Sequence, residues 1–129
     1  MTRYAWEHIH LRSPDPAATA QWYQDKLGAE IIRTPQSDGS TRYDLDLTGQ
    51  KIFIAKADPA ATGASPQTPY MGLDHFGLTV ENIDAAVAEL KGKGVAFTVE
   101  PKTIRPGVRI AFLRGPQNVH IELLDRNAT

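Results

Sequence analysis

The sequence contains no cysteine among its 129 residues. It therefore cannot form a disulfide bond, supply a thiolate nucleophile, or bind an iron–sulfur cluster or a zinc ion through sulfur. Any metal ion bound by this chain must be held by nitrogen and oxygen donors.

The sequence also lacks a strong charge of one sign and a long apolar run. Fourteen basic and 15 acidic residues give a formal net charge of −1, which provides no net field for nucleic acid or an anionic membrane. No apolar run approaches the ~20 residues that span a bilayer, and the start MTRYAWEHIH lacks the layout of a secretory signal. We therefore expect no nucleic-acid or membrane partner, and a cytoplasmic location.

What is present is the composition of an ordinary folded protein. Hydrophobic residues make up 41% of the chain and charged residues 22%, without the polar bias of a disordered segment. The length predicts one compact domain.

The second half of the chain repeats the first in the order of its expected elements. WEHIHL, SPDPAATAQWYQDKLG and AEIIR in the first half correspond to LDHFGL, VENIDAAVAELKGKG and VAFTV in the second. Asp15 and Asn82 are typical helix N-caps, and Gly28 and Gly94 are placed where helices end. Residues 5–12 alternate as a half-buried strand does, and three strand candidates follow each helix.

The predicted fold class is therefore α+β, with two βαβββ modules in tandem. Their mixed sheets are expected to form a cup around a central cavity for a metal ion and a substrate. Within a single domain, module 1 covers about residues 4–57, a linker about 58–71, and module 2 about 72–126.

The repeat indicates which residues occupy equivalent positions. His8 aligns with His75, and Glu122 aligns with Ile54. If a pseudo-twofold axis relates the modules, then His8, His75 and Glu122 converge on that axis. Two imidazoles and one carboxylate make a facial triad, which binds Fe(II) and also suits Mn(II), Zn(II), Co(II) or Ni(II). The alternative is a structural role for all three, although a carboxylate within an apolar strand requires compensation.

Two further histidines are candidate catalytic residues. His10 and His120 each lie two residues from a proposed ligand, so they share its strand face at ~7 Å along the strand. A histidine near a metal ion can act as an acid or a base. The alternative is that both merely line the cavity.

Several motifs resemble the vicinal oxygen chelate superfamily, also called the glyoxalase/bleomycin resistance/dioxygenase family, over essentially the whole chain. They are EHIHL, WYQDKLG, GLDHFGLTVENIDAAVAELKGKG and AFLRGPQNVHIELLD, although Gly115-Pro116-Gln117-Asn118 replaces the family's Asp-Pro-x-Gly. The resemblance implies metal ligation by His8, His75 and Glu122. It places the family's fourth ligand on Ile54, which cannot coordinate a metal.

This resemblance implies a metal-dependent enzyme that chelates a small substrate through two oxygens. The missing fourth ligand puts an Fe(II) extradiol dioxygenase-like reaction slightly ahead. A glyoxalase-like lyase or a methylmalonyl-CoA epimerase-like isomerase is the first alternative, and a metal-free drug-binding protein of the bleomycin-resistance kind is the second. We also expect a homodimer, because pairing would cover the sheet edges of two βαβββ units.

Overall fold

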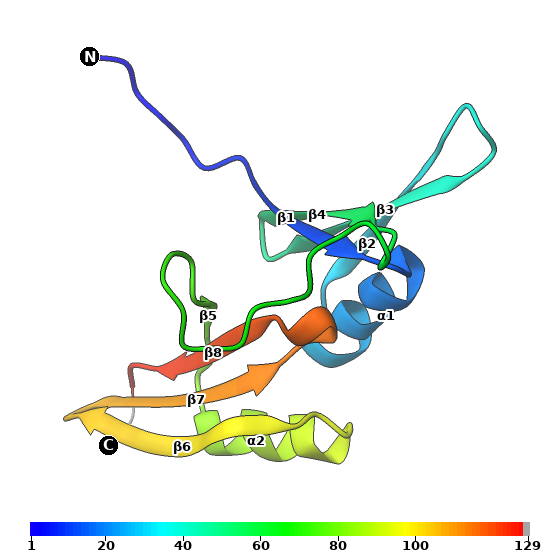
Figure 1. Ribbon diagram of the computed structural model, residues 1–129. Helices are drawn as coiled ribbons and strands as arrows, with labels where there is room; N and C mark the ends of the chain where they lie inside the picture. The colour runs from blue at the N-terminus through cyan, green and yellow to red at the C-terminus, as the bar shows by residue number, and fades with distance from the viewer. Residues whose placement is uncertain (128–129) are drawn as a thin grey trace. The chain divides into compact units, whose positions relative to one another are not determined.

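The computed structural model describes residues 1–127. Contacts along the chain divide it into two compact units, Met1–Ala64 (unit 1) and the part from Ser65 onward (unit 2). Each unit has the order strand, helix, strand, strand, strand (Figure 1). The predicted tandem βαβββ architecture is confirmed.

Unit 1 contains a mixed four-stranded sheet. Its strands lie in the order β1-β4-β3-β2, with β1 parallel to β4 and the other neighbours antiparallel. The elements are β1 (His8–Ser13), α1 (Pro16–Leu27), β2 (Glu30–Pro35), β3 (Thr41–Leu47) and β4 (Gln50–Lys56). The first strand starts later than the alternation of residues 5–12 predicted, since residues 5–7 lie outside the sheet.

Helix α1 begins and ends at the predicted residues. The Asp15 carboxylate accepts a hydrogen bond from the Ala18 amide at 3.1 Å, and Gly28 ends the helix with φ 73° in the left-handed region. The helix buries Tyr23, and β4 buries Ile52 and Ile54. Because side chains alternate along a strand, Phe53 lies on the opposite face of β4.

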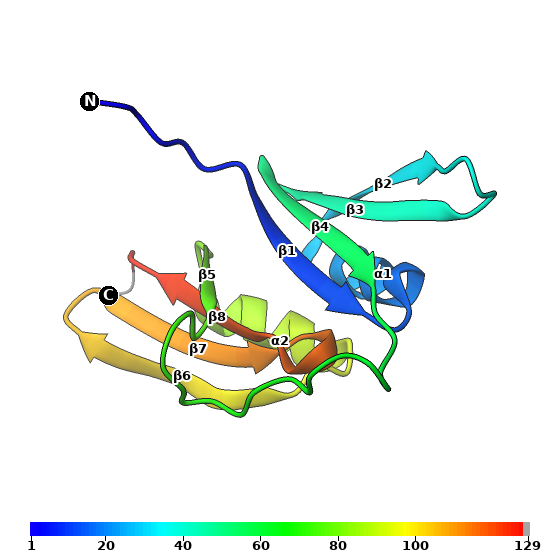
Figure 2. The ribbon, with the colours of Figure 1, turned by 45° about the horizontal axis from the view of Figure 1, so that its top comes forward.

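Unit 2 repeats this arrangement. Within the described residues its four-stranded sheet has the order β5-β8-β7-β6, again with the first and last strands parallel. Figure 2 shows α2 on one face of this sheet, with β8 between β5 and β7. The elements are β5 (Phe76–Thr79), α2 (Ile83–Gly92), β6 (Phe97–Arg105), β7 (Val108–Arg114), a 3-10 turn (Pro116–Asn118) and β8 (His120–Asp125).

A hydrogen bond connects the last strand of unit 2 to helix α2. Asn82 caps α2 by accepting from the Ala85 amide at 3.0 Å, and the buried Asp125 carboxylate accepts from the Ile83 amide at 3.1 Å. Ile121 and Leu123 are buried, so the intervening residues of β8 lie on the other face of the strand. This alternation leaves one face of β8 free for polar residues.

None of the helices within residues 1–127 is both long and apolar enough to cross a membrane.

Candidate metal centre

The strand register changes which residues of the two units are equivalent. In unit 1 His10 is paired with Phe53, whereas in unit 2 Gly77 is paired with Glu122. His10 and Gly77 occupy equivalent places, so the counterpart of Glu122 is Phe53. The predicted equivalence with Ile54 was wrong by one residue. Ile54 is 4% exposed and lies on the opposite face, since a shift of one residue moves a side chain across the sheet.

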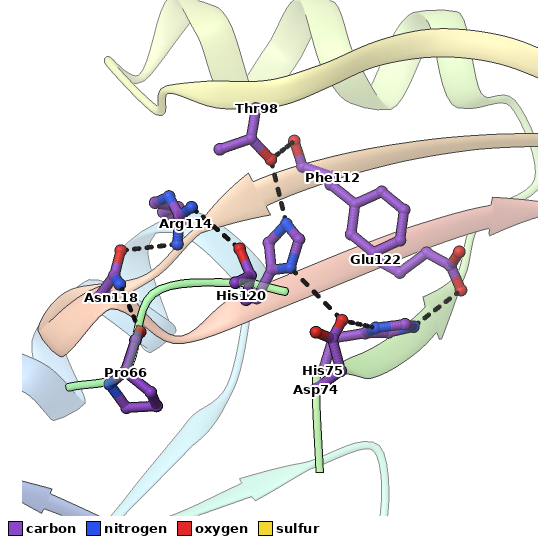
Figure 3. Close-up of polar contacts among 10 residues, drawn as sticks. Pro66, Asp74, His75, Thr98, Phe112, Arg114, Asn118, His120 and Glu122 are labelled. Atoms are coloured by element: carbon purple, nitrogen blue, oxygen red, sulfur yellow. Dashed lines mark hydrogen bonds and ion pairs between the residues drawn. The ribbon is translucent and has the colours of Figure 1, made fainter. Parts of the chain in front are cut away.

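Two of the three predicted ligands lie together in unit 2. His75 directly precedes β5, Glu122 lies within the neighbouring parallel strand β8, and the His75 Nε2 to Glu122 Oε1 distance is 3.7 Å (Figure 3). Both donors are of the type that a divalent transition metal takes, and their separation lets one ion contact both.

A glycine lies opposite the carboxylate across the strand pair. A Cβ atom on Gly77 would lie 3.5 Å from Glu122 Oε1 and 3.2 Å from Leu124 Cδ1. Its φ angle does not require glycine, and the tighter of the two contacts would be with the end of the Leu124 side chain.

The carboxylate of Asp74 contacts the other nitrogen of His75. Its Oδ2 atom lies 2.7 Å from His75 Nδ1, which leaves Nε2 as the nitrogen nearer Glu122. This hydrogen bond to the imidazole holds the pKa of Asp74 below its usual range. The carboxylate is therefore ionised at neutral pH and stays a strong acceptor.

His120 lies beside this pair on the same face of β8 as Glu122. The centroids of the His120 and His75 rings are 6.1 Å apart, and the His120 ring packs against Phe112 at 4.6 Å. Its Nε2 atom is 3.1 Å from Thr98 Oγ1, while its Nδ1 atom has no hydrogen-bond partner among the described residues. Burial and then the nearby Arg114 charge lower the pKa of His120. The predicted catalytic candidate therefore lies beside the His75 and Glu122 pair, with its Nδ1 atom 3.8 Å from Asp74 Oδ2.

A second donor set overlaps the first. One ligand atom each from Asp74, His75 and His120 lie within 4.8 Å of one another. The structure thus offers Asp74 either as a metal ligand or as a residue that orients His75.

The other two predicted histidines lie on β1 of unit 1. The His8 ring stacks on Phe53 at 4.2 Å, its Nδ1 atom contacts the Glu7 carboxylate, and the ring centroids of His8 and His10 are 5.9 Å apart. The Arg42 guanidinium lies 4.8 Å from the Phe53 ring centroid. Within its own unit each predicted residue therefore has a polar or aromatic neighbour, and the convergence of His8 with His75 and Glu122 stays a prediction.

Unit 1 also contains a cleft of about 680 Å³ beside His10 and Phe53. Its wall is partly apolar and partly cationic, as in a site for a small molecule. The lining residues include His10, Arg42, Tyr43, Phe53, Ala55 and Lys56.

The sequence prediction missed Asp74, Thr98 and Phe53. Thr98 and Phe53 could not be found, because strand pairing alone brings them to the histidines. Asp74 had a signal, since an acidic residue precedes the equivalent histidine in both halves, as Glu7-His8 and Asp74-His75.

The comparisons with known proteins agree with the resemblance. The family model described as Glyoxalase/Bleomycin resistance protein/Dioxygenase superfamily matches residues 6–123. The chain is 33% identical to an ethylmalonyl-CoA/methylmalonyl-CoA epimerase of Cereibacter sphaeroides over 82% of this chain and 84% of that protein. It is 25% identical to a lactoylglutathione lyase of Haemophilus influenzae over 95% and 93% of the two chains.

A solved structure agrees with the fold. The crystal structure of the glyoxalase family protein from Enterococcus faecalis matches with a TM-score of 0.75 at 25% identity, covering 94% of this chain and 97% of that one.

Proposed function

Because the chain belongs to the Glyoxalase/Bleomycin resistance protein/Dioxygenase superfamily, we propose that it is a metal-dependent lyase or isomerase. It would move a proton within a small substrate that is chelated through two neighbouring oxygen atoms. The observation that carries this proposal is the 3.7 Å approach of His75 Nε2 to Glu122 Oε1, with His120 on the same face of β8 and its Nδ1 atom without a hydrogen-bond partner among the described residues.

The residues present fit a divalent metal ion. His75 and Glu122 supply one nitrogen and one oxygen donor, and His8 is the proposed third ligand, which leaves positions for a chelating substrate. When bound, such an ion polarises the substrate oxygens and makes the adjacent C–H group more acidic. Fe(II), Mn(II), Zn(II), Ni(II) and Co(II) all suit this donor set.

His120 is the proposed base. Its Nε2 atom lies 3.1 Å from Thr98 Oγ1 and its ring packs on Phe112, so the direction of Nδ1 is restricted. Nδ1 makes no hydrogen bond among the described residues, and the Asp74 carboxylate 3.8 Å away would stabilise the imidazolium formed when it accepts a proton. An epimerase must remove a proton from a carbon and return one to it; a neutral imidazole can accept the proton, and the imidazolium so formed can return one. His10 is the candidate on unit 1, two residues from His8 on the same strand face.

The names of two relatives support proton transfer over oxygen insertion. One is an epimerase and the other a lyase. This evidence reverses the order of preference that the ligand count alone suggested.

An Fe(II) dioxygenase-like reaction is the second candidate, because of Phe53. This residue takes the place in unit 1 that Glu122 has in unit 2 and offers no donor atom. The proposed ligand set therefore has three members, as the resemblance to extradiol dioxygenases implies.

Elemental analysis of anaerobically purified protein tests the proposal, with His8→Ala and Glu122→Ala alongside. We expect about one transition metal per chain in the wild type and loss of it in both variants. Solvent deuterium incorporation into methylmalonyl-CoA, used as the first probe, then tests proton transfer. Oxygen consumption with a catechol by an iron-loaded protein would favour the dioxygenase. A wild type that takes up no metal would overturn both candidate functions, the lyase or isomerase and the dioxygenase, and would leave a metal-free binding protein.

We further propose that the chain forms a homodimer. Several large apolar side chains are exposed, including Trp6 at 87%, Met71 at 99% and Leu73 at 79%. Pairing would cover such side chains. A monomeric mass by light scattering at micromolar concentration would contradict this.

A further inference from the structure

A carboxylate directly precedes the candidate ligand histidine in each unit. Glu7 contacts His8 Nδ1 in unit 1, and Asp74 Oδ2 lies 2.7 Å from His75 Nδ1 in unit 2. Consecutive residues within a strand point to opposite faces, so such a contact between neighbours is unusual in a sheet. It is possible here because Glu7 and Asp74 both lie before the first strand of their unit.

The contact determines which imidazole nitrogen is free. An Nδ1–H group that donates to a carboxylate leaves the lone pair on Nε2, and it also restricts rotation of the ring. In unit 2 the freed Nε2 atom is the one that lies 3.7 Å from Glu122 Oε1 (Figure 3).

We infer that Glu7 and Asp74 are positioning residues, which hold His8 and His75 with Nε2 available to a metal ion. The inference rests on the proposed metal-dependent function. Both units then use the same arrangement, since a carboxylate commonly accepts a hydrogen bond from the imidazole nitrogen of a histidine ligand that does not bind the metal.

Asp74 has the stronger position of the two. Its side chain is 36% exposed, whereas that of Glu7 is 65% exposed and more open to screening by water. Asp74 Oδ2 also lies 3.8 Å from His120 Nδ1, so one carboxylate faces both imidazoles. We therefore expect a larger effect from Asp74 than from Glu7.

The competing explanation is that Asp74 is itself a ligand, together with His75 and His120. The two explanations differ in what the loss of His120 does. A ligand set that includes Asp74 needs His120, whereas one that includes Glu122 does not.

Cobalt titration of metal-free protein, followed by its visible absorption, separates these explanations. We expect Asp74→Ala to weaken Co(II) binding by about 10- to 100-fold, with one ion per chain still bound at saturation. Asp74→Asn, which keeps an acceptor oxygen, should weaken Co(II) binding less than Asp74→Ala does. Glu7→Ala should weaken it by about 10-fold or less. Glu81→Gln removes an exposed charge from unit 2 and should bind like the wild type.

Long-range ¹H–¹⁵N histidine spectra of the metal-free protein give a readout independent of metal. At a pH where the imidazoles are neutral, we expect the Nδ1–H form of His75 in the wild type. Its Nε2–H population should rise in Asp74→Ala, while Glu81→Gln leaves it unchanged.

Unchanged tautomer and unchanged cobalt affinity in Asp74→Ala would overturn the inference. Loss of the bound ion in Asp74→Asn and His120→Ala, with retention in Glu122→Ala, would overturn it by making Asp74 a ligand. A wild type that binds no cobalt would defeat the proposed function, and the histidine spectra alone would then decide whether Asp74 orients His75.

Discussion

The two units have the same strand order, and one cross-strand pair near the candidate site differs between them. Unit 1 has His10 opposite Phe53, whereas unit 2 has Gly77 opposite Glu122. In unit 2 a Cβ atom on Gly77 would lie 3.5 Å from the carboxylate of Glu122. In unit 1 two aromatic rings fill the equivalent positions, and the Arg42 guanidinium lies near one of them. One scaffold thus carries an acidic donor in one copy and an aromatic surface in the other.

The difference lies on one face of the paired first and last strands, the face that carries the candidate ligand Glu122 in unit 2. The opposite face of β4 and β8 is apolar in both units, with Ile52 and Ile54 matching Ile121 and Leu123. Substitutions on the apolar face should change stability, and substitutions on the polar face should change metal binding.

Ile54→Glu should have the largest effect, on stability. It places a carboxylate at a position where the side chain is 4% exposed. Among the described residues, that position has no counterpart of the imidazole that pairs with Glu122 in unit 2. Burying an unpaired charge typically costs several kcal/mol, so we expect the free energy of unfolding to fall by about 3–5 kcal/mol. Urea denaturation measures this. A stable variant with increased metal affinity would restore Ile54 as the counterpart of Glu122.

Glu122→Ala should abolish stoichiometric metal binding. The expected loss exceeds the 10- to 100-fold that removal of an orienting residue costs, because a ligand itself is lost. The metal-free protein should be as stable as the wild type, since the side chain is 17% exposed and its removal relieves a desolvation cost. Metal content and thermal unfolding check both parts, with Glu81→Ala as the control.

Gly77→Val should weaken metal binding by displacing Glu122. The added carbon atoms would enter the space where even a Cβ atom lies 3.5 Å from the carboxylate. Overpacking of this kind costs about 1–3 kcal/mol, which corresponds to roughly tenfold or more in affinity. Gly63→Ala is the matched control, because no atom lies within 4 Å of a Cβ there. Equal affinity in the two variants would show that the glycine is not needed for the site.

Phe53→Glu should have the smallest effect, and in the opposite direction. It places a carboxylate at the counterpart of Glu122 and should strengthen metal binding, by at most about tenfold, since the stacking of Phe53 on His8 is lost. Phe53→Gln separates the charge from the loss of the ring. A weaker site in Phe53→Glu than in Phe53→Gln would place this residue away from the metal ion.

Much of the fold could be predicted from local patterns. The caps Asp15 and Asn82, the closing Gly28 and the strand alternation each act within a few residues, so they are visible in the sequence. The sequence also named His75, His120 and Glu122, which the structure brings together in unit 2, because Glu122 in an apolar strand and the repeated histidines mark that region; their role as ligands stays a prediction. The predicted correspondence between residues of β4 and β8 was wrong, because the repeat is weak in sequence and allowed an alignment shifted by one residue.

By itself, the sequence determined the tandem βαβββ order and the residue types available to a metal ion, because helix caps and side-chain periodicity are local. Only the tertiary structure decided that Phe53 matches Glu122, that Asp74 contacts His75 and faces His120, and that Gly77 lies opposite Glu122. Those relations depend on the pairing of strands distant in the chain. A pairing register is set by packing across the whole sheet, which no single segment encodes.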